Sequence, residues 1–150
     1  MKKNHVKILF EVQYDEDNII KESVWASKLS NNNYKIDNIP FYAYGFACND
    51  IVSAEEHSEQ LYVSELIEAS GNSTVRLLFQ NTNDIKEVRK FLKDNGCDSE
   101  QSNVDSLIAV DVPFNISYKG IKEFLDNGEA NEKWEYEEAC ISEKHQLDIK

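Results

Sequence analysis

The residues of this 150-residue chain that could do chemistry are three histidines, three cysteines and a large number of carboxylates. His5, His57 and His145 lie far apart, and none has a histidine at i+4, the spacing by which a helix binds zinc. A catalytic cysteine needs a base within hydrogen-bond reach, and the spacing of these residues does not supply one. We therefore expect surface histidines and assign no catalytic residue.

The cysteines Cys48, Cys97 and Cys140 have neither the even count of a disulfide framework nor the Cys-x-x-Cys spacing of a zinc site. Free thiols are expected, with Cys97 and Cys140 in small buried positions. Glu135 and Glu137 could pair for acid and base chemistry, but they share one face of a strand, so we expect a solvated outer row. No Asp-x-Asp-x-Asp-Gly loop is present, and no metal or cofactor is expected.

The segment Ser70-Gly-Asn-Ser-Thr74 has the composition of an anion-binding loop. Phosphate-binding loops usually lead into a helix and carry a lysine, whereas this one leads into an apolar strand and is followed only by Arg76. We interpret it as a tight connection between two subdomains.

The charge balance points to a class of partner. The chain has 28 acidic residues against 16 Lys and Arg, a formal net charge of −12. Such a protein repels nucleic acid and anionic lipid, and it attracts basic surfaces. The acids are uneven, because residues 49–68 hold six of them and no Lys or Arg, whereas residues 84–93 hold two acids and four basic residues. A solvated acidic coat that aids solubility is the alternative interpretation.

Targeting signals are not found in the sequence. The apolar run near the amino terminus is interrupted by Lys7 and Glu11, unlike the core of a signal peptide. No stretch approaches the roughly 20 apolar residues that cross a bilayer. A cytoplasmic protein is expected.

The elements that must position these residues fall into two halves. In residues 1–70, strands are predicted over 6–13, 19–29, 34–37, 50–54 and 60–69, with turns at 15–18 and 30–33. Short strands without a helix predict a small antiparallel β-barrel or a strongly curved sheet.

Between the third and fourth strands, the stretch DNIPFYAYGFACND covers residues 37–50. Read as a strand, it places Phe41, Ala43 and Gly45 on one face and a row of rings, Tyr42, Tyr44 and Phe46, on the other. That row would belong either to the core or to an interface with another molecule.

In residues 71–150 the apolar period changes. Strands are predicted over 73–79, 107–112 and 134–140, with an edge strand in 97–104. Helices are predicted over 84–95, ending at Gly96, and over 118–127, ending at Gly128. This β-α-β-β-α-β order is typical of a ferredoxin-like unit, so the fold class is α+β with two subdomains.

These landmarks, in this order, resemble a bacterial family known as domain of unknown function 4265. The matching segments are Ser23-Val-Trp25, Tyr34-Lys-Ile-Asp-Asn-Ile-Pro-Phe41, Tyr44-Gly45, Asp50-Ile-Val52, Ser70-Gly-Asn-Ser-Thr-Val-Arg76, Gly96-Cys97, Ala109-Val-Asp-Val-Pro113 and Trp134-Glu-Tyr-Glu-Glu-Ala139. The resemblance covers nearly the whole chain and implies no activity. The family pattern has Gly at position 49 and His at position 72, where this chain has Asn, so an imidazole function in that loop is excluded here.

Two functions of different class remain. The first is an immunity protein or antitoxin that covers the active site of a basic toxin, such as a nuclease, with carboxylates in place of phosphates. The partner-binding residues expected for it are Asp15, Glu16, Asp17, Tyr42, Tyr44, Asp50, Glu55, Glu56, Glu59 and Tyr62. The second is a small enzyme or ligand sensor with a pocket between the two subdomains, lined by the rings of residues 41–46, Trp25 and Trp134. A structural module without a fixed ligand is a third.

Overall fold

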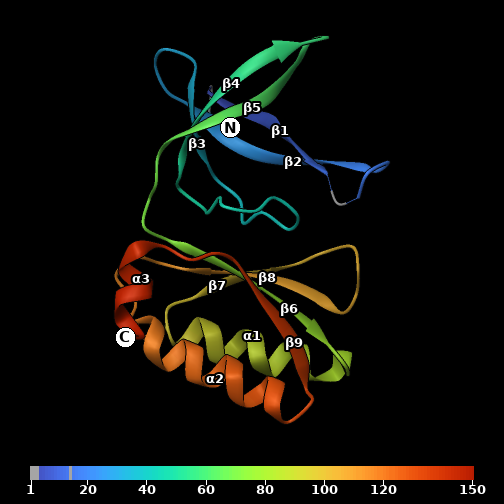
Figure 1. Cartoon of the computed structure of the whole chain (residues 1–150), viewed down its shortest axis with the longest axis vertical. Coiled ribbons are helices and arrows are strands. Elements are labelled where there is room, and N and C mark those ends of the chain that lie inside the picture. The colour runs from blue at the N-terminus through green and yellow to red at the C-terminus, as the bar shows by residue number, and fades with distance from the viewer. Residues whose placement is uncertain (1–3, 14) are drawn as a thin grey trace.

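Alternating apolar residues close the first five strands into a small barrel, seen in the upper part of Figure 1. The computed structural model describes residues 4–13 and 15–150. The barrel strands are β1 (His5–Gln13), β2 (Ile19–Lys28), β3 (Asn33–Ile36), β4 (Ile51–His57) and β5 (Gln60–Glu68). Neighbours along the chain pair antiparallel, and β5 returns to β1 through one parallel contact, between Leu9 and Tyr62, that closes the barrel.

The interior of the barrel is filled by the side chains that alternate inward along its strands and by Ala43 from the segment between β3 and β4. Its buried members are Ile8, Phe10, Val24, Ala26, Tyr34, Ile36, Ala43, Val52 and Ala54. The turn between β2 and β3 depends on Asn31 and Asn32, whose φ angles are 58° and 62°. Asparagine tolerates this left-handed region better than most residues, so the expected turn forms where the asparagine cluster predicts it.

The second half is a four-stranded sheet with helices on one face. Its strands are β6 (Ser73–Phe79), β7 (Asp98–Gln101), β8 (Leu107–Val112) and β9 (Trp134–Cys140), in the order β7-β8-β6-β9, and all neighbours are antiparallel. Its helices are α1 (Ile85–Asp94), α2 (Tyr118–Ala130) and α3 (Glu143–Asp148). A 3-10 turn, Thr82–Asp84, precedes α1.

The two faces of this sheet differ in chemistry. Val75, Leu77 and Phe79 of β6 belong to the apolar core under α1 and α2. Because side chains alternate along a strand, Thr74 and Arg76 point to the opposite face. Figure 1 shows that the barrel lies on that opposite side of the sheet, with the helices beyond it. Polar and charged residues of the sheet therefore face the barrel.

The end of α2 differs from the sequence prediction. Gly128 does not stop the helix, which continues to Ala130, and Glu132 instead takes the left-handed conformation, with φ of 58°. A Cβ atom built on Gly128 would lie 1.8 Å from Cζ2 of Trp134. Gly128 is thus required by the close approach of a tryptophan ring and not by the helix end.

The helix α3 has no counterpart in the sequence prediction. Ser142 caps it by accepting a hydrogen bond from the backbone N–H of His145, at 3.2 Å. A serine followed by Glu143 in the first turn is an N-terminal helix signal. That signal could have identified α3, although the helix is short.

Candidate functional site

The segment 37–50, here called the aromatic loop, contains no strand and lies between the barrel and the sheet (Figure 1). The strand reading of this segment is wrong for two reasons. Gly45 has φ of 80° and donates its N–H to Ala139 O of the sheet, at 2.9 Å. The backbone N–H groups of residues 41–43 donate to the side chain of Glu22 in the barrel and not to a neighbouring strand. Phe46 packs on Phe10, with ring centroids 4.8 Å apart.

Glu22 of β2 holds the loop from the barrel side. Its carboxylate is buried and accepts backbone hydrogen bonds from Phe41 at 2.5 Å, Tyr42 at 3.0 Å and Ala43 at 3.0 Å. Three consecutive backbone N–H groups thus donate to one carboxylate. These bonds stabilise its negative charge, which would otherwise be costly to bury.

Arg76 of β6 holds the loop from the sheet side and is only 4% exposed. Its guanidinium donates to Pro40 O at 3.4 Å, to Ala43 O, and to Glu137 Oε1 at 3.0 Å. The ring of Tyr44 lies 5.0 Å from the guanidinium carbon, in cation–π contact. Glu135 and Glu137 are both exposed, as a solvated outer row requires, and Glu137 is in addition the ion-pair partner of a buried arginine.

A groove opens beside Arg76 between the two halves. It consists of two adjoining hollows of about 350 and 170 Å³ that share Arg76, Leu107 and Glu137. Tyr42 and Tyr44 line the smaller hollow. The hydroxyl of Tyr44 donates to Glu137 Oε2 at 3.0 Å, and this bond to an anion raises the pKa of the tyrosine. Mostly apolar walls with a few convergent polar groups are typical of ligand sites.

The tryptophans are absent from the lining of this groove, contrary to the sequence expectation. Trp25 lies on the outside of the barrel, stacked on His5 at 4.7 Å between centroids. Trp134 is buried in the core beneath the helices, where its Nε1 donates to Leu125 O at 3.1 Å. Side chains alternate along a strand, so Trp25 lies on the face of β2 that points away from the barrel interior. Trp134 lies on the face of β9 that packs under the helices.

Asp50 is not a surface residue, and its assignment as a partner-binding residue is corrected. It is 2% exposed, and its carboxylate accepts the backbone N–H groups of Ala47 at 2.9 Å and Ser70 at 2.8 Å. These bonds tie the end of the aromatic loop to the connection between the halves. Burial nevertheless raises the pKa of Asp50.

Asp111 of β8 is the most perturbed carboxylate of this interface. Its only hydrogen bonds within the described residues come from Asn72 Nδ2, at 3.3 and 3.4 Å. Burial, with little compensation from Asn72, raises the pKa of Asp111 to about 7. Asn72 Oδ1 also accepts the N–H of Phe114 at 3.0 Å, so this loop residue is a structural link between strands.

The raised pKa of Asp111 predicts a pH-dependent stability. Between the unfolded value, near 3.8, and the folded value of about 7, the folded protein binds more protons, so the free energy of unfolding falls as pH rises through this window. We expect Asp111→Asn to stabilise the protein at pH 8, by at most roughly 4 kcal/mol, since the pKa rises by about three units and each unit corresponds to about 1.4 kcal/mol. Urea unfolding at pH 5 and pH 8 measures the effect. An unchanged pH dependence in Asp111→Asn would show that another group causes it.

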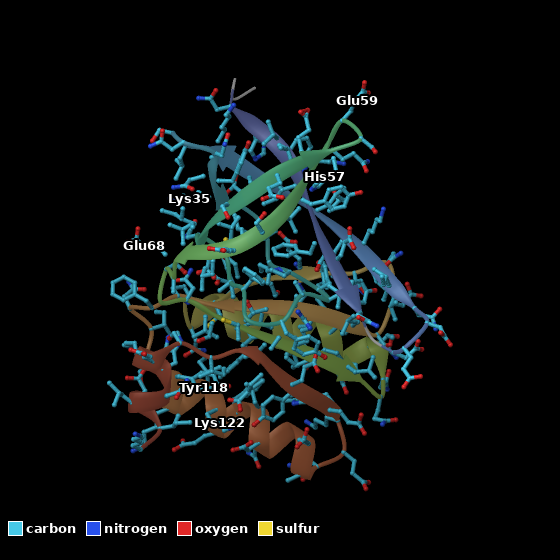
Figure 2. The ribbon with its side chains drawn as sticks, turned by 45° about the horizontal axis from the view of Figure 1, so that its top comes forward. Lys35, His57, Glu59, Glu68, Tyr118 and Lys122 are labelled. Atoms are coloured by element: carbon cyan, nitrogen blue, oxygen red, sulfur yellow. The ribbon has the colours of Figure 1, made fainter. Side chains whose placement is uncertain are left out.

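The acidic residues of the β4–β5 hairpin come together at the end of the barrel. Glu55, Glu56 and Glu59 line one hollow of about 580 Å³, which also contains Lys28. Glu59 is at the hairpin tip, where its φ of 66° forms the turn, and Figure 2 shows it at the extreme end of the molecule near His57. Three glutamates of the predicted cluster thus line one hollow, together with Lys28.

The other predicted residues lie apart from this hollow. Asp15, Glu16 and Asp17 form the exposed β1–β2 turn, in which the Asp15 carboxylate accepts from Asn18 Nδ2 and the Asp17 N–H, bonds that lower the pKa of Asp15. Tyr62 lies opposite Glu55 on β5 and accepts a hydrogen bond from Lys21 at 3.1 Å. Tyr42 and Tyr44 lie in the groove. The partner-binding residues expected from the sequence thus lie in several separate places and do not form one continuous surface.

His145 is buried, so the expectation of a surface histidine is wrong at this position. Its Nδ1 accepts a hydrogen bond from Ser73 Oγ at 2.5 Å, and its Nε2 donates to Pro113 O at 3.0 Å and Ile116 O at 3.1 Å. Burial lowers the pKa of His145, which favours the neutral ring that this pattern requires. Ser73 is buried as well, so the pair fastens α3 to the sheet and is not open to a substrate.

The remaining features to consider are the cysteines, metal ligands and membrane-spanning helices. Cys48, Cys97 and Cys140 are free, and burial raises their thiol pKa to about 12, 12 and 11. No group of three or more His, Cys, Asp or Glu residues suited to a metal occurs among residues 4–13 and 15–150. No helix in this described part is long and apolar enough to cross a membrane.

Comparisons with known proteins give a family and a fold. A family model described as "Domain of unknown function (DUF4265)" matches residues 22–136. A crystal structure of a hypothetical protein from Neisseria gonorrhoeae is similar at a TM-score of 0.82 and 25% sequence identity, covering 95% of this chain and 99% of that one. No curated protein sequence matches the chain.

Proposed function

The chain belongs to the DUF4265 family, a domain of unknown function, and we propose that it binds a basic protein through the acidic end of its barrel. The observation that carries this proposal is the hollow lined by Glu55, Glu56 and Glu59. Carboxylates around one concave space produce a stronger local field than the same charges spread over a convex surface.

The surface around the hollow supports contact with a protein. The β4–β5 ribbon continues with exposed Glu65 and Glu68 and contains no Lys or Arg between residues 51 and 68. Leu66 and Ile67 on the same ribbon are 42% and 49% exposed. Apolar side chains surrounded by acids can be desolvated by a partner while the charges steer its approach.

The most specific form of this proposal is an immunity protein, or antitoxin, that inhibits a nuclease toxin in the cytoplasm. A nuclease must bind phosphates, so its active site is basic, and an acidic hollow can bind there in place of the substrate. The neighbouring reading frame provides the test. The product of the adjacent gene should be a basic toxin domain that co-purifies with this chain with nanomolar, salt-sensitive affinity. An adjacent metabolic enzyme that does not bind the chain would contradict this form.

Neutralising the hollow should change the association rate and not the fold. In Glu55→Gln/Glu56→Gln/Glu59→Gln, we expect association with the partner to slow by on the order of tenfold at low salt, because steering depends on local charge. The melting temperature should stay nearly constant, since all three side chains are exposed. Stopped-flow or surface-binding kinetics measures the rate.

A matched control separates this effect from net charge. Glu87, Glu123 and Glu132 are exposed in the helical half, and their replacement by Gln changes the net charge by the same amount. The control variant should associate faster than the hairpin variant at every salt concentration, and within about twofold of the wild-type rate near 0.15 M salt, where charges beyond a Debye length of about 8 Å are largely screened. Equal slowing in both variants would remove the β4–β5 hairpin from the interface.

The groove beside Arg76 favours a second candidate, a small enzyme or ligand sensor. Its polar groups are Glu137, which is 46% exposed, and the hydroxyl of Tyr44. The guanidinium of Arg76 already donates to three acceptors of the protein, so the carboxylate of Glu137 is the charged group left to bind a ligand. The groove therefore suits ligands with an apolar body and a cationic group. Thermal-shift screening with aromatic amines tests this candidate. Ligand shifts that persist in Tyr44→Ala would place binding elsewhere.

We also propose that residues 1–70 and 71–150 are two subdomains and that the second is ferredoxin-like. The order β7-β8-β6-β9, with every neighbouring pair antiparallel and α1 and α2 as the two crossovers, supports the ferredoxin-like assignment. Two separate apolar cores, one in each half, support the subdomain boundary near Gly71.

A further inference from the structure

One hollow carries the charge opposite to that of the molecule as a whole. It measures about 620 Å³ and lies between α1 and the edge strand β7. Four cations line it, namely Lys86, Arg89, Lys90 and Lys93, against a single carboxylate, Asp98. The chain has a net charge of −12, so a local cluster of four positive side chains stands out, and solubility alone does not require it.

The helix aligns these four cations. Positions i, i+3, i+4 and i+7 share one face of a helix, and at about 1.5 Å of rise per residue they extend over roughly 10 Å. Arg89 is half-buried and fixed, since it donates from Nε to Ser99 Oγ and from Nη2 to Ser99 O, each at 2.9 Å. These bonds hold the positive charge of Arg89 at the wall of the hollow, where it also acts on the nearby carboxylate of Glu100.

The lysines can turn to a ligand at small cost. Lys90 pairs with Asp94 at 2.8 Å and Lys93 with Asp98 at 2.6 Å, and all four side chains are more than half exposed. Exposed pairs of this kind contribute little to stability, so an anion with a higher charge density can replace the carboxylates. No salt bridge of Lys86 occurs among the described residues.

From this geometry we propose that the hollow between α1 and β7 is a binding site for a small anion with two or more linked phosphate groups, such as the phosphate chain of a nucleotide. Phosphate oxygens match both the fork of Arg89 and the point charges of the lysines. The acidic barrel lies on the other side of the sheet (Figure 1), and at physiological salt its field is screened over about 8 Å. The site is separate from the acidic hollow and does not depend on the proposed function.

Titration with inorganic tripolyphosphate, followed by amide chemical shifts and by calorimetry, tests the proposal. We expect saturable one-to-one binding with shifts concentrated in α1 and β7, and affinity that falls as salt rises. Lys86→Gln/Lys93→Gln should weaken binding at least tenfold, because it removes both ends of the cationic stripe while leaving the structural bonds of Arg89 intact. The control Lys35→Gln/Lys119→Gln removes the same charge from exposed positions outside the hollow and should leave affinity within twofold.

Three results would overturn the proposal: no saturation, equal weakening by the control pair, or shifts centred outside α1 and β7. Titrations with ATP and with a single-stranded oligonucleotide distinguish the ligand classes. ATP should bind at the same residues with a stoichiometry of one. A requirement for the oligonucleotide, with no binding of tripolyphosphate or ATP, would reject a small-anion site.

Discussion

Gly128→Ala is expected to lower the free energy of unfolding by about 3 kcal/mol, although alanine is normally the better helix former by about 1 kcal/mol. The reversed sign follows from geometry, because the new Cβ would lie 1.8 Å from the Trp134 ring. That ring is buried and packs against Phe79 and Phe124, with centroids 5.6 and 5.3 Å away, so a shift away from the new Cβ would disturb this packing.

Gly120→Ala in the same helix is the matched control. A Cβ on Gly120 meets nothing within 4 Å, so this substitution should stabilise the protein by about 0.5 to 1 kcal/mol. Chemical denaturation of the two variants side by side measures both values. If Gly128→Ala also stabilises, the tryptophan does not pack against the helix as described.

Arg76→Met is the second large effect, with an expected loss of about 3 kcal/mol in the free energy of unfolding. Methionine retains part of the packing but leaves Pro40 O and Ala43 O without their side-chain donor. Removing one member of a buried ion pair costs roughly 3 to 5 kcal/mol. The lower end applies here, since Glu137 is half exposed and water can solvate it.

Lys122→Met provides the comparison for Arg76. Lys122 also pairs with a glutamate of β9, at 3.1 Å from Glu138, and it is 26% exposed, compared with 4% for Arg76. Its loss should cost less than about 1 kcal/mol, because a more exposed pair gains little net energy. Urea unfolding resolves the difference. Similar losses in both variants would mean that the contact of Arg76 with the aromatic loop adds nothing.

The strands and most turns could be predicted because their determinants are local. Short runs rich in apolar residues define β6 and β8 at the predicted bounds. Asn31 and Asn32 define a turn by their own conformational preference. Gly96, with φ of 89°, ends α1 as expected. Gly128 shows the limit of this reasoning, since its role depends on a residue of another element that the local pattern does not contain.

The candidate site was less predictable for the same reason. Glu22 and Arg76 show no local signal of their roles, because their partners are backbone atoms of residues 40–43, far away in the sequence. Asp50 looked like the first acid of an exposed cluster, but its position in a turn made it a hydrogen-bond acceptor for buried amides. The charge of the hairpin, in contrast, could be predicted, because exposed carboxylates need no partner.

The aromatic loop joins the halves a second time. The chain passes between barrel and sheet only once, near Gly71, and a single flexible connection would let the two bodies rotate freely. Pro40 to Ala43 are held between Glu22 and Arg76, and Tyr44 and Gly45 also bond to β9, so the loop restrains rotation between the halves. This restraint keeps the acidic hollow of the barrel and the basic hollow beside α1 on opposite sides of the sheet, which gives the molecule a charge dipole.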